Sequence, residues 1–203
     1  MPLNLAKLTH LKAFDPDSGE LNAIIDTPRG SRNKFKYDDQ LGLFKLGGAM
    51  PSGSFFPFDF GFVPSTLGED GDSIDVLVLT DDPVFTGCLV PSRLIGVIEA
   101  EQTEEGRTIR NDRLIAVAAD SRRHQDVRSL EKLNDTLLEE LEHFFVSYNE
   151  VKGKQFKPLK RSNPARAREI IEEAMKTFSR QQRRGGSKSK STTTGSGIKK
   201  RGR

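Results

Sequence analysis

The sequence predicts an α+β fold that is mainly β, in which a small antiparallel barrel or sandwich precedes two helices. Short apolar segments recur roughly every ten residues between residues 21 and 118, and glycine, proline and aspartate separate them. This spacing is typical of a small all-β unit rather than of βαβ repeats. Two longer segments after residue 128 carry apolar residues at three- and four-residue steps, which predicts amphipathic helices.

Six short segments are predicted as strands because they are rich in β-branched, aromatic or alternating apolar residues. They are Leu21–Asp26, Leu41–Leu46, Ile74–Leu79, Leu89–Pro91, Arg93–Ala100 and Leu114–Ala118. The segment Ser54–Pro64 is added to them, since every second residue from Phe56 to Phe62 is phenylalanine and the rings would share one face of a strand. No lysine or arginine lies among these rings, so we expect them in the core rather than in a stacking surface for nucleic acid.

Two helices are predicted to complete the domain. Ser129 is the expected N-cap of the first, and apolar residues follow it at helical spacing from Leu130 to Tyr148. Asn163 before Pro164 predicts the start of the second, because proline is favoured at the first position of a helix. Its apolar stripe runs as far as Phe178, and both helices are expected to pack on the β unit.

The charge of the chain is divided between a body and a tail. The 203 residues carry a formal net charge of +3, but residues 179–203 hold nine of the 32 basic side chains and none of the 29 acidic ones. The body is therefore acidic. We expect a folded domain over residues 1–178 and a disordered tail over residues 179–203, which is rich in Gly, Ser, Lys and Arg and lacks an apolar set able to offset ordering entropy. Such a tail either binds nucleic acid or another polyanion, or is simply a solvated extension.

Cysteine content and hydropathy favour a cytoplasmic protein without a membrane partner. The single cysteine, Cys88, excludes an intramolecular disulfide. No signal pattern precedes the first strand, and no apolar run is long enough to span a bilayer.

The most informative stretch is Gly68–Val78, where an acidic turn leads directly into a β-branched strand. Asp70, Asp72 and Asp75 lie within six residues. Asp and Gly are also the residues that ordinary turns prefer, so the spacing of Asp70 and Asp72 alone is ambiguous. Asp75 favours a metal site, since it lies one residue into the apolar run, where an unpaired carboxylate is costly to bury. Hard oxygen ligands of this kind suit Mg²⁺ or Mn²⁺.

Several further segments, together with this turn, resemble the family I soluble inorganic pyrophosphatases. The turn matches the family signature Asp-Gly-Asp-x-Ile/Val-Asp-Val. The other matching segments are Ile25–Pro28 with Lys34 six residues later, Phe56–Gly61, the run Asn111–Val117, and His-Phe-Phe-x-x-Tyr at residues 143–148. The resemblance runs from about Leu21 to Phe178. It implies a pyrophosphatase-like catalytic domain with a five-stranded OB-like antiparallel barrel flanked by two C-terminal helices, and Mg²⁺-dependent hydrolysis of diphosphate to two phosphates.

The same resemblance implies roles for individual residues. Asp72 corresponds to the carboxylate that takes a proton from a metal-bound water. The implied metal ligands are Asp70, Asp75, Glu104, Asn111 and Asp26, and the implied phosphate-binding residues are Lys34, Arg113 and Tyr148. In the second acidic segment, Glu101, Glu104 and Glu105 all remain candidates for one ligand. The implied cofactor is Mg²⁺, with Mn²⁺ as a substitute, the substrate is diphosphate, and the assembly is a homo-oligomer.

The chain also departs from the family pattern at positions around this predicted site. Lys36 replaces an acidic residue, Phe56 and Phe60 replace tyrosines, Asn111 replaces an aspartate and Asn149 replaces a lysine. Two hypotheses therefore stand beside each other. The chain is either a divergent diphosphatase, or a protein of the same fold with low turnover that binds or cleaves another phosphorylated ligand.

Overall fold

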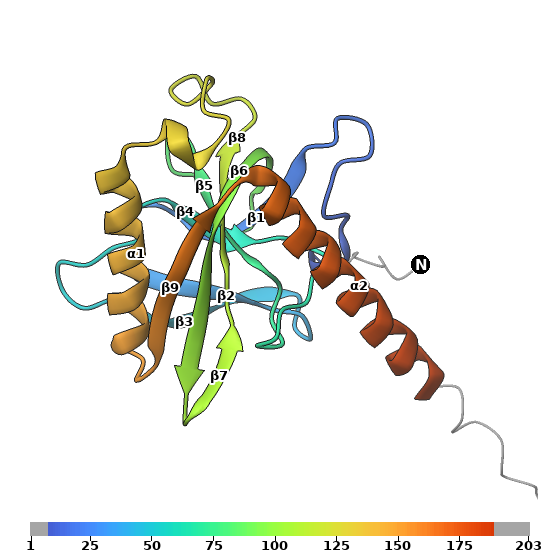
Figure 1. Ribbon diagram of the computed structural model, residues 1–203. Coiled ribbons are helices and arrows are strands. Elements are labelled where there is room, and N and C mark those ends of the chain that lie inside the picture. The colour runs from blue at the N-terminus through green and yellow to red at the C-terminus, as the bar shows by residue number, and fades with distance from the viewer. Residues whose placement is uncertain (1–7, 189–203) are drawn as a thin grey trace, which may run out of the picture.

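The computed structural model describes residues 8–188 of the chain (Figure 1). The strands are β1 (Leu21–Thr27), β2 (Asn33–Asp38), β3 (Leu43–Ala49), β4 (Asp59–Phe62), β5 (Asp75–Leu79), β6 (Leu89–Glu104), β7 (Arg107–Arg110), β8 (Arg113–Ala118) and β9 (Gln155–Ser162). The helices are η1 (Leu8–His10), η2 (Leu130–Lys132), α1 (Asp135–Glu150) and α2 (Pro164–Lys188), of which the η elements are short 3₁₀ turns.

Five strands pair in a closed ring, in the order β1, β4, β5, β8, β6 and back to β1. The expected mainly β fold with a five-stranded barrel and two helices agrees with this ring. One detail differs from the expectation, because β5 and β8 run parallel whereas the other pairs of the ring are antiparallel. A closed ring with an odd number of strands cannot alternate direction at every step, so one parallel pair is required.

The predicted strands Leu89–Pro91 and Arg93–Ala100 form one long strand, β6, which also pairs with β7 and β9 beyond the ring. Gly96 allows the strand to bend at this point. Its φ is +155°, and the register with β8 shifts beside it. A Cβ at Gly96 would lie 2.5 Å from the Leu130 side chain and 2.6 Å from the Ser162 carbonyl oxygen, so only glycine fits this close approach.

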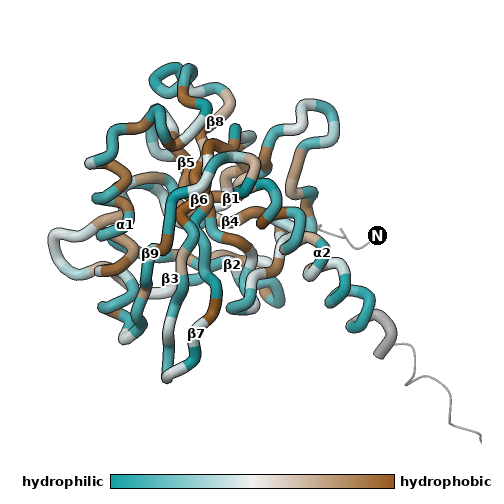
Figure 2. Tube along the Cα trace, viewed as in Figure 1, coloured by the Kyte–Doolittle hydropathy of each residue, from teal (hydrophilic) through white to brown (hydrophobic). Residues whose placement is uncertain are grey.

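Side-chain alternation gives the sheet two apolar faces. Along β5, Leu77 and Leu79 belong to the cluster that α1 covers, whereas Val76 and Val78 belong to the cluster that α2 covers. Figure 2 shows hydrophobic residues concentrated along the central strands and on the inner sides of the helices. The prediction that the phenylalanine-rich segment is core is confirmed at Phe56, whose side chain is fully buried against α1.

The start of α1 corrects one prediction. Ser129 precedes the short η2 turn and makes no side-chain cap, whereas the Asn134 side chain caps α1 by accepting a hydrogen bond of 2.8 Å from the Thr136 amide. The apolar periodicity continued through both elements, which hid the break between them. The predicted cap of α2 is confirmed, since Asn163 Oδ1 accepts from the Arg166 amide at 3.0 Å.

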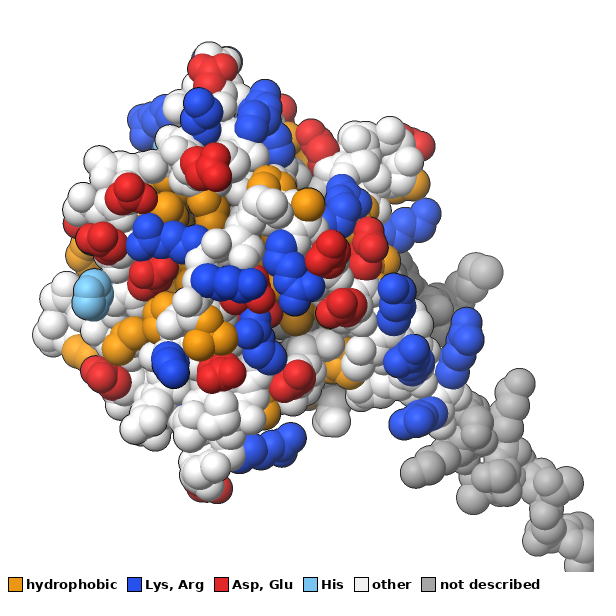
Figure 3. All heavy atoms as spheres, viewed as in Figure 1, with side chains coloured by type: hydrophobic (Ala, Val, Ile, Leu, Met, Phe, Trp, Pro, Cys, Tyr) orange, Lys and Arg blue, Asp and Glu red, His pale blue; other side chains and the backbone are white. Residues whose placement is uncertain are grey.

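The C-terminal boundary also differs from the expected one. Helix α2 continues to Lys188, ten residues beyond Phe178, where we expected the tail to begin. Lys and Arg side chains gather along this exposed end of the helix (Figure 3). The remaining predicted tail, residues 189–203, lies outside the described residues. Within the described part of the chain, no helix is both long and apolar enough to cross a membrane.

Candidate active site

All nine side chains that the family resemblance implicates line one cleft of about 760 Å³. They are Asp26, Lys34, Asp70, Asp72, Asp75, Glu104, Asn111, Arg113 and Tyr148. They come from the ring strands β1, β5 and β8, from β2 of the separate β2–β3 hairpin, from the turn before β5, from the end of β6, from the link between β7 and β8 and from the end of α1. The barrel therefore gathers at one opening side chains that are more than 120 positions apart in the chain.

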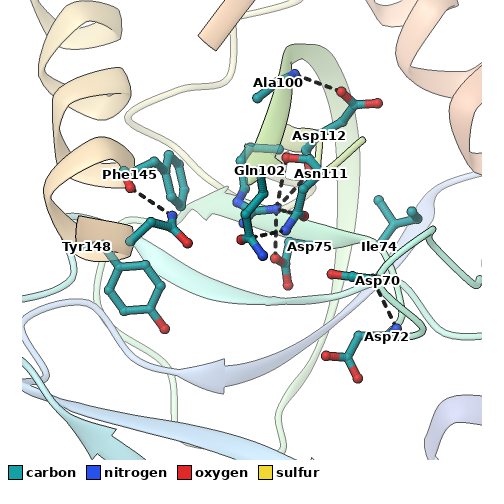
Figure 4. A network of polar contacts seen from close by, with 12 residues as sticks. Asp70, Asp72, Ile74, Asp75, Ala100, Gln102, Asn111, Asp112, Phe145 and Tyr148 are labelled. Atoms are coloured by element: carbon teal, nitrogen blue, oxygen red, sulfur yellow. Dashed lines mark hydrogen bonds and ion pairs between the residues drawn. The ribbon is translucent and has the colours of Figure 1, made fainter. Parts of the chain in front are cut away.

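The acidic turn is folded by its own hydrogen bonds. Asp70 Oδ1 accepts from the Asp72 amide at 3.0 Å (Figure 4). The Gly68 amide donates to the Asp72 carbonyl at 2.8 Å. Gly71 has a φ of +87°, which suits a residue without a side chain. The turn interpretation of the sequence is thus confirmed, and the carboxylates of the same segment line the cleft, where a metal site stays a prediction.

Burial raises the pKa of Asp70 above its usual range, and the negative charges of Asp75 and Asp72 add to this effect. The carboxylate of Asp72 is 53% exposed and reaches Lys36, whose Nζ lies 2.7 Å from Asp72 Oδ2. Burial alone would lower the pKa of Lys36, but the bond to Asp72 and the charges of the acidic turn raise it. The turn is therefore a centre of negative potential to which one protein cation is already attached.

Asp75 contacts a second protein cation. It begins β5, and Arg113 begins the neighbouring parallel strand β8, so Arg113 Nη1 lies 2.9 Å from Asp75 Oδ2. The Arg113 guanidinium is buried and lies 5.1 Å from the ring centroids of both Phe145 and Phe156. Its Nε has no hydrogen-bond partner among the described residues.

Asp26 and Lys34 form a buried pair at the other side of the cleft. Lys34 Nζ lies 2.5 Å from Asp26 Oδ1 and 4.3 Å from the centroid of the Phe60 ring. Burial raises the pKa of Asp26 to about 6, although the charge and hydrogen bond of Lys34 act in the opposite direction. Phe60, which stands where the family pattern has tyrosine, thus supplies an aromatic face to the lysine ammonium.

Asn111 and Glu104 face the cleft but are engaged by protein groups. Asn111 Nδ2 donates to Gln102 Oε1 at 3.0 Å, and Asn111 Oδ1 accepts from Arg113. Glu104 pairs with Lys154, whose Nζ lies 2.8 Å from its Oε2. Gln102 and Glu104 share one side of β6, and the intervening positions alternate to the other side.

This alternation narrows the choice among the three glutamates that the sequence left open. Glu104 and Glu105 line the cleft, and Glu101 is not among the described residues that line it. Glu105 stands at the tip of the β6–β7 hairpin with a φ of +50°. Glu104 lies on the same side of β6 as Gln102, which contacts Asn111, so Glu104 is the best placed of the three glutamates to share a ligand with Asn111.

Tyr148 is buried at the end of α1. Burial raises the pKa of its hydroxyl, and the charge of Asp75 contributes in the same direction. The hydroxyl accepts a hydrogen bond from Lys152 Nζ, which also lies 4.1 Å from the centroid of the Tyr148 ring. The next residue, Asn149, turns its amide back to the Phe145 carbonyl at 2.8 Å (Figure 4).

Three further side chains of the cleft were not predicted. Gln102, Lys152 and Lys154 line it beside the predicted residues. The sequence placed the run Lys152–Lys154 in a loop between the two helices, but it held no signal for the direction of that loop. Strand β9 follows this loop and pairs with β6, which brings both lysines to the opening of the barrel.

The donors of the acidic turn fit a hard divalent cation. Among residues 8–188, no three His, Cys, Asp or Glu side chains gather closely enough to hold a metal ion in this conformation. The protein's own cations explain this spacing, since Lys36 and Arg113 each hold one carboxylate. The chemistry of the donor set nevertheless matches Mg²⁺, because carboxylates that repel one another face a shared, solvent-connected cleft.

Comparison with known proteins identifies similar chains of one family. A family model described as inorganic pyrophosphatase matches residues 23–179. The inorganic pyrophosphatase of Geobacillus stearothermophilus is 34% identical over 161 residues, which cover 79% of this chain and 95% of that protein. The inorganic pyrophosphatase of Thermus thermophilus is 35% identical over 156 residues, covering 77% and 87% of the two chains.

Solved structures show the same likeness in three dimensions. The crystal structure of the inorganic pyrophosphatase from Thermus thermophilus has a TM-score of 0.78 at 32% identity, and the match covers 86% of this chain and 99% of that one. The crystal structure from Neisseria gonorrhoeae has a TM-score of 0.75 at 30% identity, covering 83% and 96%.

Proposed function

This chain belongs to the inorganic pyrophosphatase family, and from that premise we propose that it is a Mg²⁺-dependent enzyme that hydrolyses diphosphate to two phosphates in the cleft described above. The observation that carries the proposal is the meeting of two opposite sets of charges. The acidic turn forms one side of the cleft, and Lys34, Arg113 and Tyr148 line the same space. Such a site binds a cation and a polyanion together.

Asp70 and Asp75 would hold the first metal ion, with Glu104, Asn111 and Asp26 available for others. Bound Mg²⁺ supplies a Lewis acid that neutralises phosphate oxygens and makes a water molecule more acidic, and Mn²⁺ is a reasonable substitute. The ion pairs of Asp72 with Lys36 and of Glu104 with Lys154 involve partly exposed groups, so ligands can exchange with them at low cost.

Asp72 is the residue best placed to accept a proton from the attacking water. Its carboxylate reaches into the cleft from the tip of the turn, and its backbone amide is tied to Asp70, which fixes its position. Lys36 holds one of its two oxygens and leaves the other available. A carboxylate held this way can take the proton without first reorganising the turn.

Lys34, Arg113 and Tyr148 would bind the phosphate groups. Lys34 is positioned by Asp26 and by the Phe60 ring, and the guanidinium of Arg113 is held against two aromatic rings. Buried donors of fixed orientation stabilise an oxyanion without further ordering. Tyr148 offers a hydroxyl that burial keeps protonated at neutral pH, so it can donate a hydrogen bond to phosphate.

A second candidate function is that of a fold relative with low turnover that binds or cleaves another phosphorylated ligand. The observation that favours it is the engagement of cleft carboxylates and amides by protein groups, at Lys36, Lys154 and Gln102. Each such contact competes with a metal ion for a donor. Turnover and metal dependence distinguish the two functions.

The experiment that tests the proposal is phosphate release from diphosphate with Mg²⁺, and then Mn²⁺, varied over a wide range. Wild type is compared with Asp72→Asn and with Asp17→Asn, which makes the same change of charge at an exposed turn outside the cleft. We expect metal-dependent release that falls at least about a hundredfold in Asp72→Asn and is unchanged in Asp17→Asn. If wild type released phosphate no faster than Asp72→Asn at any metal concentration, the diphosphatase proposal would be contradicted and the second function favoured.

Two further partners are part of the proposal. We propose a homo-oligomer, supported by large apolar side chains that are exposed in the single chain, such as Leu43, Leu46, Phe55 and Phe85. Sedimentation equilibrium would contradict this if it gave the mass of one chain.

Binding of nucleic acid or another polyanion through residues 179–203 is supported by their charge, and it should weaken steeply with salt.

A further inference from the structure

Lys152 occupies the turn that follows α1 and reaches back into the cleft. It lies four residues after Tyr148, so a helical turn brings the two side chains to the same face. Its Nζ donates to the Tyr148 hydroxyl and lies over the Tyr148 ring at 4.1 Å from the centroid. Although the residue as a whole is exposed, its ammonium group is thus directed at the phosphate-binding side of the cleft.

Lys152 differs from the other lysines of the cleft in its partners. Of the four lysines among the described residues that line the cleft, three form ion pairs, with Nζ–oxygen distances of 2.5, 2.7 and 2.8 Å. These are Lys34 with Asp26, Lys36 with Asp72, and Lys154 with Glu104. Within residues 8–188, none of the ion pairs involves Lys152. Among the described residues, the one hydrogen bond of its side chain is with the Tyr148 hydroxyl.

The surroundings of Lys152 are electropositive. Desolvation of its ammonium group and repulsion by Lys34, Lys154 and Arg113 outweigh the attraction of Asp75 and lower its pKa to about 8. A cation held in such a place, next to a hydroxyl donor and without a carboxylate partner, favours the arrival of an anion. The neighbouring Asn149 does not take this role, since its amide is tied to the Phe145 carbonyl.

We propose that Lys152 and Tyr148 together bind one phosphate group in the cleft, on the side where Lys34 and Arg113 lie. The inference rests on the proposed function, since it assigns a further substrate-binding residue to the same site. Lys152 donates a charge-assisted hydrogen bond to a phosphate oxygen, and the Tyr148 hydroxyl donates a second one once Lys152 turns from it to the phosphate. The residue acts on binding of substrate and product rather than on the proton transfer at Asp72.

The test is the affinity for inorganic phosphate, measured by isothermal titration calorimetry in the presence of Mg²⁺ and again without it. Four proteins are compared: wild type, Lys152→Met, Lys152→Arg and Lys157→Met. Lys157 is an exposed lysine of β9 outside the cleft, so its variant makes the same change of charge as Lys152→Met. We expect phosphate binding to weaken about tenfold or more in Lys152→Met, to be largely kept in Lys152→Arg, and to be unchanged in Lys157→Met.

Equal phosphate affinity in wild type and Lys152→Met would overturn the inference, and so would equal weakening in Lys157→Met, which would show a general charge effect. Thermal unfolding of each variant checks that the fold is kept, and Lys152→Gln gives a second neutral variant should methionine lower stability. Diphosphate turnover by wild type separates this inference from the proposed function. If wild type hydrolyses diphosphate and Lys152→Met binds phosphate as tightly as wild type, the phosphate-binding role of Lys152 is excluded and the proposed diphosphatase function stands. If phosphate binding depends on Lys152 but wild type does not hydrolyse diphosphate, the proposed function is excluded and the role of Lys152 stands.

Discussion

Arg113 Nη1 lies 2.9 Å from Asp75 Oδ2, and the two residues begin neighbouring parallel strands of the barrel. This is the one parallel pair of the ring, so its register places a cation beside the last carboxylate of the acidic turn. The Arg113 guanidinium also lies against the rings of Phe145 and Phe156. The pair therefore links the metal-binding side of the proposed site to its phosphate-binding side.

Replacing Arg113 should damage both stability and activity. Arg113→Met leaves Asp75 without its partner, and we expect the free energy of unfolding to fall by about 1–3 kcal/mol. Arg113→Lys should restore little activity, because an ammonium group lacks the planar face that lies against the two rings and the fork of donors that contacts several partners. Urea denaturation and diphosphate turnover measure the two effects. Arg180→Met, on the exposed end of α2, is the control. Full activity in Arg113→Lys would contradict the proposed role.

Lys36 is expected to weaken metal binding, because its ammonium group competes for Asp72. Lys36→Glu removes that cation and adds a carboxylate, so the Mg²⁺ concentration for half-maximal turnover should fall by about fivefold. Direct binding of Mn²⁺, followed by electron paramagnetic resonance, should likewise be tighter in Lys36→Glu than in wild type. The matched control is Lys45→Glu, which breaks an ion pair of 3.1 Å with Asp38 outside the cleft. Unchanged Mn²⁺ affinity in Lys36→Glu would mean that Lys36 and the metal do not compete.

Phosphate binding should depend on pH through Lys152. Its pKa is lowered to about 8, mainly by desolvation and by Lys34 and Lys154, while Asp75 opposes the shift and Arg113 adds to it. The ammonium group is charged below that pH and loses its proton above it. Affinity for phosphate should therefore be highest below pH 8 and decline between pH 8 and 9. Lys152→Arg stays charged over this range, so calorimetry at several pH values should show a flatter profile for it. If phosphate affinity fell with pH in the same way in wild type and in Lys152→Arg, Lys152 would be excluded as the source of the pH dependence.

The cap of α1 can be tested against the cap that the sequence suggested. Asn134→Ala removes the hydrogen bond to the Thr136 amide and should lower the free energy of unfolding by about 1 kcal/mol. Ser129→Ala removes no cap and should change it by less than about 0.5 kcal/mol. Urea denaturation of both variants measures the difference. A larger loss in Ser129→Ala would mean that the helix begins where the sequence indicated.

Local patterns in the sequence predicted the class of the fold, and the family resemblance implied the members of the site. Alternation placed Phe56 in the core, and helical spacing located α1 and α2. The Asp-Gly-Asp turn is recognisable without a structure, since its hydrogen bonds join residues four or fewer positions apart. All nine residues that the resemblance implicated line one cleft. The elements and the turn could be predicted because periodicity and turn chemistry act over short distances along the chain, whereas the site residues came from the family resemblance.

Only the tertiary structure decided which cation faces which carboxylate. Nothing local to Asp72 indicates that Lys36 is its partner, and nothing near Asp75 points to Arg113. The packing of β2 beside the acidic turn joins the first pair across 36 positions, and the register of β5 and β8 joins the second across 38. Lys152 contacts Tyr148 over only four positions, but its place at the cleft depends on the path of the loop into β9, which pairs with β6. Electrostatic energy depends on distance in space rather than along the chain. The charge balance of the site was therefore set when the barrel closed.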